Sequence, residues 1–203
     1  MGYWADDYDW RGREAALSRL TQFRGEAGGL SLHFVHVRSA HPNAMPLLLS
    51  HGWPGSIVEF AKVIPMLLDP TQFGGNAEDA FHVVARSLPG FGFSDKPTAT
   101  GYGVQKMALL FDRLMRDLGY DQYVAQGGDW GAIITTYIGA QNWGACRAIH
   151  VNMPVGLPTK EEMADPSPED KVGIAALQAY KNLDPRLFYA SECQAAERRL
   201  WIG

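Results

Sequence analysis

The stretch YVAQGGDWGA, residues 123–132, decides the fold, because it is typical of a short strand that turns sharply into a helix. Three glycines surround Asp129 in this stretch. A tight strand-to-helix turn leaves no room for side chains beside its apex, so glycine is the residue that fits there. The apex residue points toward solvent at the helix N-terminus, where the helix dipole favours an anion. The pattern therefore predicts that the Asp129 carboxylate is presented at the end of a strand.

Asp129 has two interpretations at this stage. A carboxylate at such an apex can attack an electrophilic carbon and form a covalent ester. Alternatively, Asp129 caps the N-terminus of the helix predicted over residues 132–141, a position where Asp is common. The turn taken alone favours neither interpretation.

The rest of the chain alternates between predicted strands and helices. The predicted strands cover residues 30–37, 46–50, 81–87, 123–126 and 146–152. The predicted helices cover residues 57–68, 104–118, 132–141 and 170–181, with a loosely helical pattern over residues 9–24. This alternation predicts an α/β fold with a mostly parallel central sheet. Folds of this class bind ligands beyond the C-terminal ends of their strands.

Two further glycine-rich and aromatic loops follow predicted strands. They read HGWPGS at residues 51–56 and LPGFGFSD at residues 88–95. In a fold with a nucleophile elbow, the first loop gives one backbone N–H of the oxyanion hole and the residue after the nucleophile gives the other. We therefore predict Trp53 and Trp130 as the two donors. His51 precedes Asp129 in the chain, whereas the base of this fold follows the nucleophile, so we interpret His51 as a residue that shapes the loop.

Composition excludes several classes of partner. The 203 residues carry a formal net charge of -4 and have no run of Lys or Arg, so we expect no nucleic-acid partner. Cys146 and Cys193 fit neither a disulfide framework nor a metal cluster, and we expect no metal and no cofactor. The acidic N-terminus lacks the apolar segment of a signal peptide, and no stretch of about 18 apolar residues occurs. These features favour a cytoplasmic protein; a membrane anchor upstream of residue 1 and the oligomeric state stay open.

The three loops together resemble those of epoxide hydrolases in the α/β-hydrolase superfamily, most closely the microsomal-type and fungal branch. The segments at residues 69–84 and 150–154 also resemble that branch, and the resemblance covers about residues 8–194. It implies an α/β-hydrolase fold of which only the N-terminal part is present. Residues 1–27 would be the end of an N-terminal meander, residues 28–154 the first half of the core, and residues 155–203 a partial helical lid. Residues 195–203 are unlike the family.

The resemblance also implies a mechanism. Asp129 would open an epoxide to form a glycol monoester, and a His–acid pair would activate water to hydrolyse that ester to a diol. Tyr189 matches a lid tyrosine that donates a proton to the epoxide oxygen, although a packed lid aromatic is an equal interpretation. The residues expected to line the substrate pocket are His51, Pro54, Phe91 and Phe93. Together with the two tryptophans they suggest lipophilic or aromatic epoxides, as in detoxification or the catabolism of aromatic compounds.

The chain departs from the family in its last part. His150 is the single histidine after Asp129, its spacing fits a structural residue, and Asn152 stands where some relatives carry the acid. A truncated gene or a shifted reading frame would explain the missing base. We therefore expect residues 1–203 to complete at most one turnover, and to fold marginally because the strand at residues 146–152 becomes an apolar edge.

Two alternative functions stay open. A haloalkane dehalogenase also has Asp-Trp-Gly at its elbow, but the Gly-Trp-Pro loop at residues 52–54 and a tyrosine in the lid favour an epoxide hydrolase. A non-catalytic fragment that retains family sequence is the second alternative. A serine esterase is poorly supported, because no Gly-x-Ser-x-Gly pattern occurs in the chain.

Overall fold

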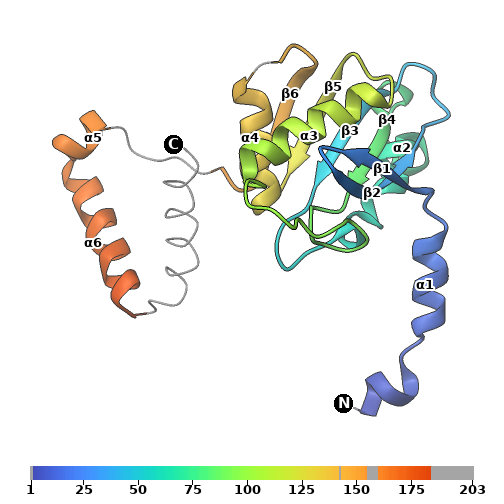
Figure 1. Cartoon of the computed structure of the whole chain (residues 1–203), viewed down its shortest axis with the longest axis horizontal. Coiled ribbons are helices and arrows are strands. Elements are labelled where there is room, and N and C mark those ends of the chain that lie inside the picture. The colour runs from blue at the N-terminus through green and yellow to red at the C-terminus, as the bar shows by residue number, and fades with distance from the viewer. Residues whose placement is uncertain (1, 142, 155–159, 184–203) are drawn as a thin grey trace. The chain divides into compact units, whose positions relative to one another are not determined.

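A mixed six-stranded sheet forms the centre of the first of two units, residues 1–154 and 155–203, in a computed structural model (Figure 1). The structure describes residues 2–141, 143–154 and 160–183. The strands lie in the order β1-β2-β4-β3-β5-β6. Their bounds are β1 Gln22–Ala27, β2 Leu30–Val37, β3 Met45–Ser50, β4 Phe81–Arg86, β5 Tyr123–Gly127 and β6 Cys146–Val151.

The direction of the strands brings the three glycine-rich loops to one edge of the sheet. Strands β4, β3, β5 and β6 pair in parallel, whereas β1 and β2 pair antiparallel with each other and β2 pairs antiparallel with β4. Strands β3, β4 and β5 therefore end at the same edge, where the loops at residues 51–56, 88–95 and 127–131 follow them. This arrangement is an α/β-hydrolase fold and confirms the predicted fold class.

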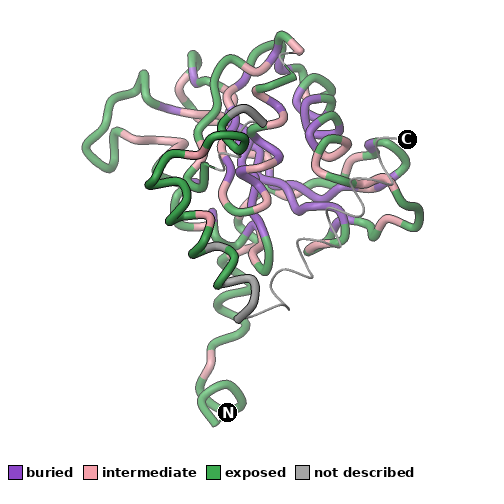
Figure 2. Tube along the Cα trace, turned by 90° about the vertical axis from the view of Figure 1, so that its left-hand side faces the viewer, coloured by how far each residue is buried: buried purple, intermediate pink, exposed green. Residues whose placement is uncertain are grey.

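Helices cover both faces of the sheet. The apolar residues of α3 Val104–Asp117 and α4 Trp130–Gln141 pack with Leu48 and Val84 on one face. The 3-10 turn η2 Ile57–Phe60 and helix α2 Val63–Leu68 pack with Leu47 and Leu49 on the other. Successive residues of β3 thus enter opposite cores, as the two-residue period of a strand requires. Figure 2 shows the buried residues gathered around the strands.

The remaining helices and turns lie before β1, between α2 and β4, and in the second unit. In the first unit they are η1 Tyr3–Asp7, α1 Trp10–Ser18, η3 Pro70–Phe73 and η4 Ala77–Asp79. In the second unit they are α5 Lys160–Ala164 and α6 Pro168–Leu183. Among the described residues, no helix is long and apolar enough to cross a membrane.

The five strands predicted from the sequence are confirmed to within one residue at each end, but two helical predictions were wrong in part. The helix predicted over residues 9–24 ends at Ser18, and β1 begins at Gln22 within the stretch assigned to the meander. Gly28 and Gly29 both have positive φ, which allows a tight turn that pairs β1 with β2.

The helix predicted over residues 57–68 divides into η2 and α2. Pro65 explains the division, because its ring would collide with the carbonyl of residue 61 and it has no N–H to donate. Helix α2 therefore begins at Val63, with Pro65 in its first turn, where a missing N–H costs nothing.

Strand β6 forms one end of the described sheet. Residues 147–150 of this strand are exposed, and Ile149 is 41% accessible. Within the described residues, the strand therefore presents an apolar side chain and a free edge, as the sequence predicted.

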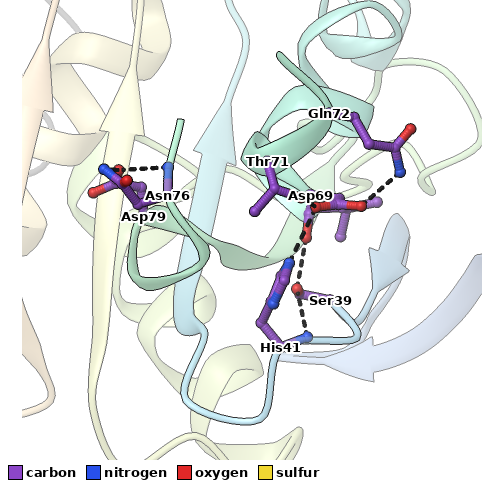
Figure 3. Close-up of polar contacts among 8 residues, drawn as sticks. Ser39, His41, Asp69, Thr71, Gln72, Asn76 and Asp79 are labelled. Carbon is purple, nitrogen blue, oxygen red and sulfur yellow. Dashed lines mark hydrogen bonds and ion pairs between the residues drawn. The ribbon is translucent and has the colours of Figure 1, made fainter. Parts of the chain in front are cut away.

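Asp69 organises the loop that follows α2 (Figure 3). Its Oδ1 accepts a hydrogen bond from the Thr71 hydroxyl at 2.6 Å and lies 3.1 Å from Nε2 of His41. Its Oδ2 accepts from the Gln72 amide at 2.5 Å. Nearby, the Ser39 hydroxyl donates to the Leu68 carbonyl at 2.6 Å. These contacts join the loop before β3 to the loop before β4, and the bonds donated to Asp69 hold the pKa of its carboxyl well below its usual value.

We predict that Asp69→Asn lowers the free energy of unfolding at pH 7 but has a smaller effect at pH 3. The pKa of Asp69 is lower in the folded than in the unfolded chain, so its contribution is complete above its unfolded value of about 3.9 and is lost as the pH falls below that. Urea unfolding at the two pH values measures the difference, with Glu78→Gln as an exposed control. An Asp69→Asn effect that is equal at both pH values would contradict this reason.

Candidate active site

The backbone of Asp129 adopts an unusual conformation. Its φ is 53°, and it is the one non-glycine residue with positive φ that the described ranges contain. Asp tolerates this left-handed region better than most residues, yet the conformation persists only where surrounding packing enforces it. Gly128 and Asp129 are the two residues between the end of β5 and the start of α4, so the predicted sharp turn is present.

The glycines beside Asp129 allow the turn to pack against strand β3. A Cβ atom added to Gly127 would overlap the carbonyl of Gly131, and one added to Gly131 would overlap the carbonyl of Ser50 at the end of β3. The Gly128 N–H donates to that same Ser50 carbonyl at 3.3 Å. The glycines are therefore required by the close approach of two backbones, which is the reason the sequence suggested.

The Asp129 carboxylate points to the loop after β3. Its Oδ1 accepts a hydrogen bond from the Trp53 N–H at 2.8 Å. A Cβ on Gly52 would overlap this carboxylate, and the Trp53–Pro54 peptide bond is cis. Among the contacts of the described residues, the carboxylate accepts no hydrogen bond from an α4 amide. The geometry thus supports presentation of Asp129 to the loop over a simple capping role.

The second predicted oxyanion donor is placed differently. The partly buried Trp130 side chain packs against the larger core cluster, and among the described residues its N–H makes no hydrogen bond to Asp129. Trp53 is thus the predicted donor that contacts the carboxylate in this structure, and the role of Trp130 stays a prediction.

His51 is buried and uses both ring nitrogens. The Leu88 N–H donates to its Nε2 at 3.1 Å, so the proton lies on Nδ1, which donates to the Gly52 carbonyl at 2.9 Å. Burial lowers the pKa of His51, as does the nearby Arg86, whereas the bond to Gly52 opposes this shift. A neutral ring with both nitrogens engaged supports a role in shaping the loop and leaves no nitrogen free to act as a base.

A cavity of about 410 Å³ opens beside Asp129. Its lining consists of Gly52, Trp53, Pro54, Gly55, Glu59, Gly128, Asp129 and Asn152. The predicted residues Trp53, Pro54 and Asp129 are therefore brought together.

Three other predicted pocket residues do not line this cavity. His51 lies beneath it, and the Phe91 ring packs against His51 with centroids 5.7 Å apart. The Phe93 ring packs against His33 at 5.1 Å. These two aromatic side chains thus support buried histidines of the core. Tyr189 and residues 195–203 lie outside the described residues.

Sequence reasoning missed Glu59, and it named Asn152 only as the residue that stands where some relatives carry the acid. Ile57 and Phe60 anchor the turn η2 in the core, and Glu59 between them faces the cavity. Partial burial, and then the charge of Asp129, raise the pKa of Glu59. Asn152 follows β6, and its amide lies against Gly128. A sequence signal for Glu59 existed, because this residue lies only four residues after Gly55 of the glycine-rich loop. The expectation of one continuous helix over residues 57–68 obscured that signal.

Comparisons with known proteins identify the family. The family model for the epoxide hydrolase N terminus matches residues 1–60, and that for the alpha/beta hydrolase fold matches residues 45–190. The chain belongs to the epoxide hydrolase family within the α/β hydrolases.

No cluster of three or more His, Cys, Asp or Glu side chains suited to a metal ion occurs among the residues described.

Relatives of this epoxide hydrolase family member are longer than the chain. A protein from Stigmatella aurantiaca, provisionally named an epoxide hydrolase, is 51% identical over 178 residues, which are 88% of this chain and 40% of the relative. The structure of the Aspergillus niger epoxide hydrolase is similar, with a TM-score of 0.71 and 35% identity over 94% of this chain and 49% of that one. The juvenile hormone epoxide hydrolase of Bombyx mori gives a TM-score of 0.67 at 37% identity, over 74% of this chain and 40% of that one. The chain thus spans less than half the length of each.

We predict that Gly131→Ala destabilises the fold by more than about 2 kcal/mol, because the new methyl group would overlap the Ser50 carbonyl and force the two backbones apart. The control is Gly103→Ala, where an added Cβ meets nothing within 4 Å. Urea unfolding measures both variants. A Gly131→Ala chain as stable as the Gly103→Ala chain would show that the close approach is not needed.

Proposed function

We propose that this member of the epoxide hydrolase family opens small lipophilic epoxides through an ester on Asp129, and that water then releases a diol. The hydrogen bond from the Trp53 N–H to Oδ1 of Asp129 is the observation that carries the proposal. It fixes one carboxylate oxygen and leaves Oδ2 as the attacking atom at the cavity. The side chains that line the cavity include the large apolar surface of Trp53, which suits an aryl or alkyl substituent.

In the proposed first step, Oδ2 of Asp129 attacks an epoxide carbon and a new C–O ester bond forms. The bond from that carbon to the epoxide oxygen breaks, and the oxygen takes the electron pair and then a proton. Tyr189 is our proposed proton donor, and the phenolate would regain its proton from water. The charge of Asp129 passes to the departing oxygen, so a positioned donor lowers the barrier of this step.

In the proposed second step, water attacks the ester carbonyl carbon of Asp129 and loses a proton to a base. The bond from that carbon to the glycol oxygen then breaks, that oxygen takes a proton, and the diol leaves while the Asp129 carboxylate is restored. The oxygen that gains negative charge is one of the two carboxyl oxygens, and the Trp53 N–H already donates to Oδ1. Such a fixed donor stabilises the oxyanion without reorganisation during the reaction. The same contact thus serves both steps, first by orienting the nucleophile and then by stabilising the tetrahedral intermediate.

The second step also needs a base that can deprotonate water. His51 is fully engaged, and His150, the one histidine after Asp129 in the sequence, lies on β6 outside the cavity lining. We therefore propose that residues 1–203 by themselves stop at the ester, and that sustained turnover needs a base from outside these residues. A chain that forms the ester but never a diol would in practice be a non-catalytic fragment.

We predict that styrene oxide labels the chain once, on Asp129. Peptide mass mapping after incubation should find one adduct on the peptide that contains residues 127–131, and Asp129→Asn should remove it. An adduct elsewhere, or one undiminished in Asp129→Asn, would contradict the assignment. Halide released from a chloroalkane, with no epoxide adduct, would instead favour the dehalogenase alternative.

We predict that Tyr189→Phe slows formation of this adduct by about ten- to a thousandfold, the effect of losing a positioned proton donor. The control is Tyr137→Phe on α4, where the hydroxyl contacts Gln105 on the outside of the helix pair. Quenched time courses of adduct formation give both rates. An unchanged rate in Tyr189→Phe would return this residue to a packing role.

A further inference from the structure

Glu59 places a second carboxylate beside Asp129. The loop at residues 52–55 accommodates one carboxyl group at each end. The carboxylate of Asp129 lies against Gly52, and Oε2 of Glu59 lies 3.2 Å from the point that a Cβ would occupy if one were added to Gly55. Both glycines therefore make room for an acidic side chain. Glu59 and Asp129 line the same cavity.

No positive charge in the described part of the chain balances these two carboxylates. None of the eight residues that line the cavity is basic. Among the described residues, Glu59 has no ion pair or hydrogen-bond partner. Burial and then the charge of Asp129 raise the pKa of Glu59. The cavity lining thus contains two acidic side chains and no basic one.

We propose that Glu59 is a specificity-determining residue, whose negative charge disfavours epoxides that carry an anionic substituent and favours those that carry a cationic one. This inference rests on the function proposed for Asp129. Glu59 does not react with the epoxide. It acts on the substituent that occupies the cavity, because a charge on that substituent lies close to the Glu59 carboxylate and interacts with it electrostatically.

The first arm of the test compares three ring-substituted styrene oxides in their rate of ester formation on Asp129. One is unsubstituted, one carries a 4-carboxylate and one a 4-trimethylammonium group. At pH 7.5 and low salt, Glu59→Gln should raise the ratio of the carboxylate rate to the ammonium rate by about three- to tenfold, the effect of removing one unit charge across such a cavity. The change should shrink in 1 M NaCl, where charges are screened. Glu78→Gln, which removes an exposed charge from η4, should leave the ratio unaltered.

The second arm needs no epoxide chemistry. Phenylacetate and phenylacetamide are titrated into the chain, and binding is followed by the NMR signal of the Trp53 indole N–H, assigned through Trp53→Phe. Phenylacetate should bind with lower affinity than phenylacetamide, and Glu59→Gln should reduce the difference between the two affinities.

The two arms separate the two claims. One outcome is that styrene oxide fails to modify Asp129 while Glu59→Gln still reduces the difference in affinity between phenylacetate and phenylacetamide. In that case the proposed reaction fails and the role of Glu59 stands. If Asp129 is modified but neither the rate ratio nor the difference in affinity responds to Glu59→Gln, or if Glu78→Gln produces the same response, the role of Glu59 is overturned.

Discussion

The close approach of two backbones, at the end of β3 and at the turn from β5 to α4, is the constraint on which the site depends. Gly131 permits it, because a side chain there would overlap the Ser50 carbonyl at the end of β3. Gly127 permits the sharp turn itself, because a side chain there would overlap the Gly131 carbonyl. The same packing holds Asp129 at a φ of 53°, a conformation that an isolated peptide would seldom adopt. The strain at this one residue is maintained by the sheet on one side and α4 on the other, so the position of Asp129 is fixed by the fold and not by a flexible loop.

Polar contacts extend this rigidity to the neighbouring loops. The Trp53 N–H joins the loop after β3 to Asp129, and neutral His51 joins the same loop to the backbone of Leu88 after β4. Beneath them, the buried Arg86 donates to the Ser50 hydroxyl at 2.7 Å. The three loops that follow parallel strands therefore form one connected layer. A carboxylate held in this way needs little rearrangement before it attacks, which is how preorganised sites lower reaction barriers.

The sequence predicted the parts of the fold that depend on local pattern. The apolar runs of β3, β4 and β5 and the glycines around Asp129 carry their own signal, and the structure has strands and a sharp turn there. Strand β1 was missed because half of its residues are exposed and charged residues interrupt its apolar pattern, so the pairing with β2 is decided by the turn at Gly28 and Gly29 rather than by hydrophobic periodicity. The site residues divide in the same way. Asp129 and Trp53 stand in local motifs. The place of Glu59 depends instead on a 3-10 turn anchored in the core, and that of Phe93 on a distant histidine, His33.

A crystal structure of the chain after reaction with styrene oxide tests the central claim most directly, which is that the fold presents Asp129 as a nucleophile held by the Trp53 N–H. We predict an ester on Oδ2 of Asp129, with Oδ1 still about 3 Å from the Trp53 nitrogen and the aromatic ring in the cavity beside that residue. An adduct on another residue, or an Asp129 ester whose carbonyl oxygen has turned away from Trp53, would contradict it.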